Sequence, residues 1–205
     1  MNGYATRLVN EPEKRLITPT QYYIDTGFFV PGEIDTISNY CSQFMLRDGE
    51  LFNGHDYEER KARLHFIEQP DSQNRWIYDK INTLVGFYND TIFGFDLIGY
   101  KYMQYAEYDV GGHQKFHADI RYGFDGQYIF EHMRKLSLIV MLSDSSEYEG
   151  GDLSLEVSGP GRGIPIRLEK GQVLMFPSFI PHQVNPVTSG LRKTLVTWIL
   201  GPKFR

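Results

Sequence analysis

The sequence of 205 residues has a single cysteine, Cys41, so it excludes an internal disulfide. We expect Cys41 to act as a small buried hydrophobic residue. No apolar run approaches the roughly 18 residues that a membrane-spanning helix requires, which argues against a membrane protein. Residues 1–16 also lack the apolar stretch of a secretory signal, so the sequence predicts a cytoplasmic protein.

An excess of positive charge is absent too. The 21 basic residues face 26 acidic ones, and the net charge of −5 disfavours general binding to nucleic acid or to anionic membranes. Internal repeats and low-complexity segments are missing, which excludes repeat architectures and wholesale disorder. A chain of this length can bury a core without disulfides, and we expect one domain over residues 1–205.

Aromatic residues and turn formers are plentiful. Aromatics make up 15% of the chain, and 20 Gly and 10 Pro indicate many turns, which favours a β-rich fold. Within residues 1–96 the sequence predicts extended chain at 16–30 and an amphipathic helix at 31–44 that begins with Pro31. A polar connection is expected at 47–63 and a second helix at 74–90. This half is therefore interpreted as helical and extended support.

Residues 97–205 have a different sequence pattern, in which short apolar runs alternate with turn residues. Eight such runs at close spacing are typical of an all-β sandwich or barrel such as a jelly roll. The runs lie at 97–110, 115–120, 135–143, 152–157, 164–168, 172–177, 182–187 and 194–200. We therefore predict a mostly β fold, a jelly-roll (double-stranded β-helix) core with helices packed outside it.

One pair of residues suggests a metal site inside this core. His117 and Asp119 are two positions apart, so on a strand they project from the same face. His182 begins the seventh predicted strand, and the second and seventh strands of a jelly roll lie close together. Two imidazoles and one carboxylate would then form the facial triad of non-haem Fe(II) oxygenases.

Other interpretations of these residues stay open. A His-x-Asp pair is a weak signal by itself and is often a surface pair, and His182 can equally be a loop histidine. On a helix, His113 and His117 would share a face as in zinc proteases, but Gln114 and Lys115 stand where the general-base Glu is needed. The flanking sequence is also β-like, which disfavours that helix.

Arg192 follows His182 by ten residues, and the segment between them has the composition of a turn joining two strands. Both side chains could then face the same barrel mouth. A guanidinium in that position would bind a carboxylate bidentately at a fixed distance from the metal. These are the requirements of 2-oxoglutarate, whose 2-oxo acid end chelates iron while its distal carboxylate needs a cation. The alternative for Arg192 is a surface salt bridge.

Five ordered motifs over roughly residues 97–200 resemble the Fe(II)/2-oxoglutarate-dependent oxygenases, and within them the prolyl 4-hydroxylase-like branch and its PKHD-type hydroxylases. The motifs are Tyr108-Asp-Val-Gly111, His117-Ala-Asp119, Leu136-Ser137 through Leu142-Ser143, Tyr148-Glu-Gly-Gly-Asp-Leu153, and His182-Gln-Val-Asn-Pro-Val-Thr-Ser-Gly-Leu-Arg192. The resemblance implies a dioxygenase that uses Fe(II), 2-oxoglutarate and O₂, with ascorbate as an optional addition. It would hydroxylate an unactivated C–H bond and release succinate and CO₂.

The resemblance also implies roles for individual residues. His117, Asp119 and His182 would bind iron, and Arg192 would pair with the distal carboxylate of 2-oxoglutarate. Tyr108 and Trp198 match cosubstrate and pocket residues of prolyl hydroxylases, although each can equally be a core aromatic. Some prolyl hydroxylases carry a polar residue where this chain has Met141 or Leu153, so a hydroxyl such as Thr194 or Ser137 is a candidate helper of Arg192.

The segment 120–134 departs from the prolyl hydroxylases, and this leaves the substrate open. We expect a prolyl or other residue of a peptide or protein, while a small molecule or an unpaired nucleobase remains an alternative. Tyr122–Gly126 is a candidate lid or a plain hairpin tip. Two other functions also remain, a cupin-like metal-binding jelly roll without oxygenase activity and a scaffold without turnover.

Overall fold

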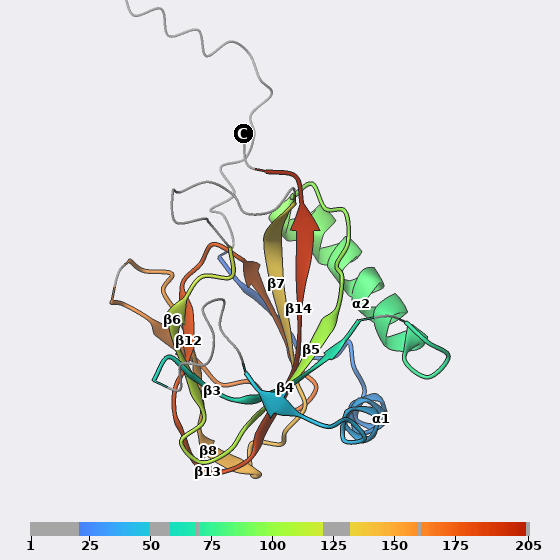
Figure 1. The fold of residues 1–205 in the computed structure, drawn as a ribbon. Helices are drawn as coiled ribbons and strands as arrows, with labels where there is room; N and C mark the ends of the chain where they lie inside the picture. The colour runs from blue at the N-terminus through green and yellow to red at the C-terminus, as the bar shows by residue number, and fades with distance from the viewer. Residues whose placement is uncertain (1–20, 50–57, 69, 121–131, 160, 204–205) are drawn as a thin grey trace, which may run out of the picture.

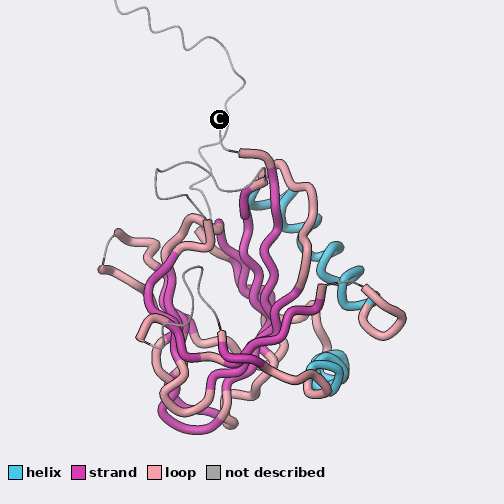
Figure 2. The backbone as a smooth tube through the Cα atoms, viewed as in Figure 1, coloured by secondary structure: helices cyan, strands magenta, loops and turns pink. Residues whose placement is uncertain are grey.

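A computed structural model describes residues 21–49, 58–68, 70–120, 132–159 and 161–203. Two antiparallel β-sheets face each other, and both α-helices lie on one outer side of the larger sheet (Figures 1 and 2). The mostly β architecture with flanking helices confirms the predicted fold class.

The larger sheet has seven strands, and its centre is formed by the two longest strands, β7 and β14. Its order is β1 (Tyr23–Asp25), β11 (Val173–Pro177), β7 (Met133–Met141), β14 (Arg192–Gly201), β5 (Met103–Tyr108), β4 (Arg63–Ile67) and β2 (Arg47–Asp48).

The smaller sheet has five strands, in the order β10 (Ile164–Ile166), β9 (Leu153–Leu155), β12 (His182–Val184), β6 (His113–His117) and β3 (Arg60–Lys61). A separate pair is formed by β8 (Tyr148–Gly150) and β13 (Val187–Gly190). The second and seventh predicted strands are β6 and β12, and they are hydrogen-bonded neighbours.

Helix α1 (Pro31–Cys41) begins at Pro31 as predicted but ends before residue 44. Helix α2 (Arg75–Tyr88) runs into a single π-helical turn, η1 (Asn89–Phe93), and Gly94 ends it with a φ of 65°, a left-handed conformation that suits glycine. Neither α-helix in the described part of the chain has the length and apolar character that crossing a membrane requires.

The polar connection predicted at 47–63 is partly wrong, because this stretch contributes β2, β3 and the start of β4. These strands gain their stability from backbone pairing with a neighbour, as where Arg47 lies opposite Leu64 and Arg60 opposite Gln114. Such short edge strands need no alternation of apolar residues, so periodicity does not reveal them.

The central strand β7 separates two apolar clusters, because successive side chains of a strand point to opposite faces. Leu136, Leu138 and Val140 pack with the helices, whereas Ile139 and Met141 pack between the two sheets. The inter-sheet layer positions the candidate site, and the helix layer supports the sheet from behind.

Helix α2 provides a direct test of that support. Ile81 is fully buried against the sheet, whereas Phe87 on the same helix is 62% exposed. We expect Ile81→Ala to lower the free energy of unfolding by about 2–5 kcal/mol, because it leaves a cavity in the core. Phe87→Ala should change it by about 0.5 kcal/mol or less. Urea denaturation followed by circular dichroism measures both, and equal losses would contradict this account of the packing.

Cys41 is buried with none of its surface exposed, and burial raises the pKa of its thiol to about 12. Only the thiolate is a nucleophile, so the native protein should not react with a disulfide reagent at pH 8. Reaction should appear only in denaturant, at one thiol per chain. Rapid labelling of the native protein would show that Cys41 is not buried between α1 and the rest of the core.

Candidate metal centre

Three side chains from two loop–strand junctions meet between the sheets. His117 ends β6 and His182 begins β12, and the pairing of the strands sets these two residues directly opposite each other. Their ring centroids are 4.3 Å apart, and Asp119, which is 6% exposed, follows β6 by two residues. One ligand atom from each of the three lies within 4.8 Å of the others.

Backbone carbonyls fix the orientation of both imidazoles. Nδ1 of His117 lies 2.9 Å from the carbonyl oxygen of Lys115, and Nδ1 of His182 lies 3.0 Å from that of Ile180. A carbonyl can only accept, so each Nδ1 carries the proton and each Nε2 keeps its lone pair. Both Nε2 atoms approach Asp119, at 3.7 Å from Oδ1 for His117 and 3.5 Å from Oδ2 for His182.

The carboxylate is held from its other side by two residues of β7. The hydroxyl of Ser137 donates to Oδ2 of Asp119 at 2.6 Å, and Nη1 of Arg134 lies 3.9 Å from Oδ1. Ser137 also shares a hydrogen bond of 2.9 Å with Ser178. These contacts restrict the rotation of a buried carboxylate and leave its oxygens directed at the imidazoles.

The charge states suit metal binding. Burial, followed by the neighbouring His182, lowers the pKa of His117 to about 4, so the imidazole is neutral at pH 7. Burial alone would raise the pKa of Asp119, but the two histidines, Arg134 and Ser137 outweigh it and hold the pKa below its usual range. Two imidazole nitrogens and one carboxylate fit a divalent metal such as Fe(II) and leave coordination positions open.

Arg192 begins β14 and lies inside the barrel, with 2% of its surface exposed. Its Nε is buried without a hydrogen-bond partner. Burial lowers the pKa of Arg192, while Tyr108 and Tyr148 act in the opposite direction. An arginine remains charged in any case, so this cation has unused capacity for an anionic ligand.

The other cosubstrate candidates lie along the same inner face. Tyr108 is opposite Arg192 in the β5–β14 pair, with the guanidinium 5.3 Å from its ring centroid. Thr194 is 1% exposed and follows Arg192 by two residues, so both point the same way. Trp198 lies further along β14, opposite Ser137, and its Nε1 is buried without a partner.

Ser137 is therefore not a helper of Arg192, because its hydroxyl is bonded to Asp119 and it pairs with Trp198, six residues along β14 from Arg192. Of the two suggested hydroxyls, only that of Thr194 lies next to the arginine. Met141 is opposite Thr194 and Leu153 is buried in the same apolar cluster, so the surroundings of Thr194 are apolar.

The zinc-protease interpretation is wrong, because His113 and His117 lie on strand β6 and not on a helix. Both nitrogens of His113 contact backbone carbonyls, at 2.9 Å from Gly111 and 3.1 Å from Glu58. The candidate lid Tyr122–Gly126 lies outside the described residues.

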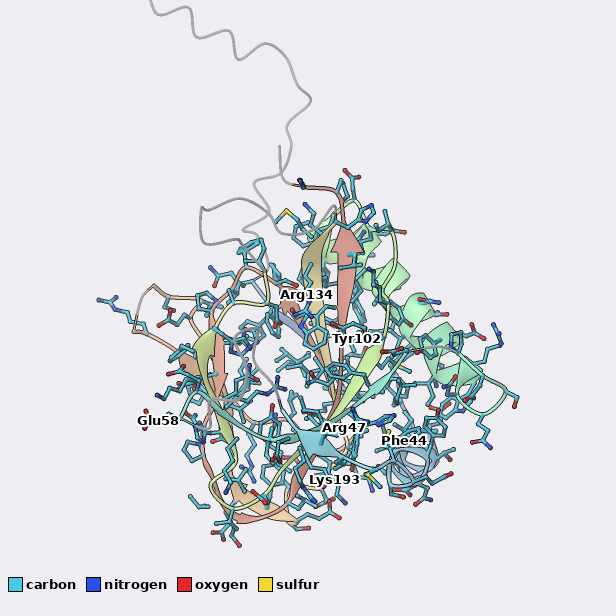
Figure 3. The ribbon with its side chains drawn as sticks, in the orientation of Figure 1. Phe44, Arg47, Glu58, Tyr102, Arg134 and Lys193 are labelled. Atoms are coloured by element: carbon cyan, nitrogen blue, oxygen red, sulfur yellow. The ribbon has the colours of Figure 1, made fainter. Side chains whose placement is uncertain are left out.

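Sequence reasoning missed a cluster of aromatic and cationic side chains beside Asp119. The guanidinium of Arg134 lies 3.9 Å from the ring centroid of Trp198 and donates to the hydroxyl of Tyr102 at 2.9 Å. Tyr102 in turn makes an edge contact with Phe66, at 5.1 Å between centroids. Arg134 and Tyr102 lie close together over the central strands in Figure 3. Arg134 belongs to the segment without a recognisable motif, so no sequence signal indicated it.

Comparison with known proteins agrees with this geometry. Residues 103–200 match the model of the 2OG-Fe(II) oxygenase superfamily. A PKHD-type hydroxylase of Synechococcus sp. (strain CC9311) is 40% identical over 75 residues, which is 37% of this chain and 33% of that protein. The chain thus matches about a third of the length of this curated relative.

Solved structures share the fold over most of the chain. A prolyl 4-hydroxylase of Pseudomonas putida has a TM-score of 0.71 at 17% identity and covers 89% of this chain and 94% of its own. A prolyl hydroxylase of Trichoplax adhaerens, solved with a peptide fragment of the hypoxia inducible factor oxygen degradation domain, has a TM-score of 0.70 at 17% identity, covering 89% of this chain and 84% of its own.

The fold and the converging residues define the class, a jelly-roll protein with a two-histidine, one-carboxylate cluster between its sheets. Residues 103–200 of the chain are similar to the 2OG-Fe(II) oxygenase superfamily, whose name implies Fe(II) as cofactor and 2-oxoglutarate and O₂ as cosubstrates.

The bond from Ser137 to Asp119 leads to a prediction about metal affinity. Ser137→Ala removes the donor that orients the carboxylate, so we expect the affinity for Mn(II), used as a redox-stable substitute, to fall about tenfold. Ser146→Ala, in an exposed turn, should leave it unchanged. Calorimetric titration of both variants measures this, and equal affinities would show that Ser137 does not position Asp119.

Proposed function

We propose that this protein is an Fe(II)- and 2-oxoglutarate-dependent dioxygenase that hydroxylates an unactivated C–H bond. The observation that carries the proposal is the convergence of His117, Asp119 and His182 within 4.8 Å inside a barrel that also buries Arg192. Iron with bound 2-oxoglutarate supplies the activation of O₂ and the oxidising power, with succinate and CO₂ as co-products.

In this proposal the chain contributes positioning and a dry site. His117 and His182 would bind iron through Nε2, since their Nδ1 atoms are committed to backbone carbonyls. Asp119 would be the third ligand and is kept ionised by its neighbours. The apolar layer between the sheets excludes water from the reacting atoms, which protects reactive species from side reactions.

Arg192 would bind the distal carboxylate of 2-oxoglutarate, because it is a buried cation whose Nε has no other partner. Tyr108 lies beside it and would line the cosubstrate pocket, and Thr194 follows Arg192 by two residues on the same face of the strand. Such a buried cation is what distinguishes an oxygenase from a cupin-like protein that only binds a metal. A role for ascorbate stays a prediction.

For the substrate we propose a prolyl or other residue of a peptide, and a small molecule is the second candidate. Two things support the peptide. The Trichoplax relative in fold was solved with a peptide, and the stacked pair of Arg134 and Trp198 offers a flat cation and a donor next to Asp119. The cytoplasm remains the predicted location.

The experiment is turnover of 2-oxoglutarate with Fe(II) and O₂, read as succinate by mass spectrometry. His117→Ala removes one ligand and should abolish succinate formation, while the protein keeps its circular dichroism spectrum. His113→Ala is the matched control, since His113 is on the same strand but only contacts backbone carbonyls. Succinate formation by the His117 variant at the wild-type rate would contradict the ligand assignment.

A further inference from the structure

A second buried guanidinium in the barrel has no role in the function proposed above. Arg60 of β3 is 9% exposed, and its Nε has no hydrogen-bond partner. No carboxylate of the described residues lies within 4.0 Å of it. Removing a permanent charge from water is costly unless an opposite charge compensates for it, so this position calls for an anion.

The position of Arg60 is next to the candidate metal centre. Arg60 lies directly opposite Gln114 in the β3–β6 pair, where side chains on the same face are about 5 Å apart at Cβ. The amide nitrogen of Gln114 lies 3.0 Å from Nε2 of His117, the atom that would bind the metal. The side chain of Gln114 thus lies between Arg60 and the candidate metal ligand His117. Its charge also acts on His117, whose pKa it helps to lower.

The local backbone makes room for this side chain. A Cβ at Gly49 would lie 3.1 Å from Nε of Arg60 and 3.0 Å from Leu64, a residue of the inter-sheet cluster. Any larger residue at position 49 would therefore press on the guanidinium. Arg60 is enclosed by the fold, in contrast to the neighbouring Lys61, which is exposed and donates to the carbonyl oxygen of Val110 at 2.7 Å.

The balance of charge around the centre indicates which ligand fits. Asp119 is the carboxylate of the centre, and Arg134 already lies beside it, while Arg192 is assigned to the distal end of 2-oxoglutarate. Arg60 is a further cation with no such assignment. The planar fork of a guanidinium matches a carboxylate, which accepts two parallel hydrogen bonds. The proposed reaction brings such groups to this place, because both the keto acid and an acidic substrate carry one.

We propose that Arg60 binds a carboxylate held beside the metal, either the one next to the keto group of 2-oxoglutarate or one carried by the substrate. This inference rests on the proposed function, since it takes the cluster of His117, Asp119 and His182 as the metal site. It adds a specificity-determining residue to the ligand set, contributed by a short edge strand.

The variants are Arg60→Met, which keeps the length of the side chain, Arg60→Lys, which keeps the charge, and Lys61→Ala as the control on the same strand. Each is loaded with Mn(II) and titrated calorimetrically with 2-oxoglutarate and with 2-oxopentanoate, which has the keto acid end but no distal carboxylate. Circular dichroism checks that each variant is folded. If Arg60→Met does not fold, the comparison is made with Arg60→Lys.

If the keto acid is the source, Arg60→Met weakens both ligands about tenfold or more, as expected for the loss of a charge-assisted hydrogen bond. Arg60→Lys should recover part of the affinity that Arg60→Met loses. The control Lys61→Ala should bind both ligands as tightly as the wild type. An Arg192→Ala variant should weaken 2-oxoglutarate only, which separates the two ends of the molecule.

If the substrate is the source, both keto acids bind the Arg60 variant as they bind the wild type. Two blocked prolyl peptides that differ only by Asp or Asn beside the proline then distinguish the variants. The wild type should bind the Asp peptide about tenfold more tightly, and Arg60→Met should bind both peptides equally.

If Arg60→Met keeps both the keto acid affinities and the peptide preference of the wild type, the inference about Arg60 is overturned, while the proposed function is unaffected. A wild-type protein that binds no 2-oxoglutarate in the presence of the metal would overturn the proposed function, and the inference with it.

Discussion

The pairing of β6 with β12 is the constraint on which the site depends. Backbone hydrogen bonds set His117 opposite His182, and the turn after β6 then returns Asp119 to the same point. A slip of one residue would turn one imidazole to the outer face of the sheet, because side chains alternate along a strand. The ligand geometry therefore depends on the backbone pairing of β6 with β12, and the side chains supply the donor atoms.

The two sheets contribute different residues to the site. The smaller sheet presents both imidazoles and Arg60, while the larger sheet presents Arg192, Ser137 and Arg134. The hydrogen bonds of the two Nδ1 atoms to backbone carbonyls restrict rotation of the imidazole rings, and the hydroxyl of Ser137 restricts rotation of the Asp119 carboxylate, before a metal binds. The site is thereby preorganised, and the helices pack against the outer face of β7 and support the larger sheet from behind.

Much of this was predictable from the sequence, because the informative residues follow simple spacing rules. The spacing of His117 and Asp119 and the jelly-roll order of strands predicted which residues come together, although Asp119 lies just after β6 and not on it. The turn before Arg192 predicted a shared barrel interior. Short edge strands such as β3 were not predictable, since backbone pairing and not apolar periodicity stabilises them. Arg60 and Arg134 were missed for a different reason, because the sequence around a lone arginine outside a motif does not show which residues surround it in three dimensions.

The central claim is that one metal ion and 2-oxoglutarate share the space between the sheets. The most direct test is the visible absorption spectrum of the anaerobic Fe(II) protein on addition of 2-oxoglutarate. Chelation of iron by the keto acid should produce a charge-transfer band in the wild type and none in His182→Ala. A wild-type spectrum without that band, or an equal band in the variant, would contradict the account.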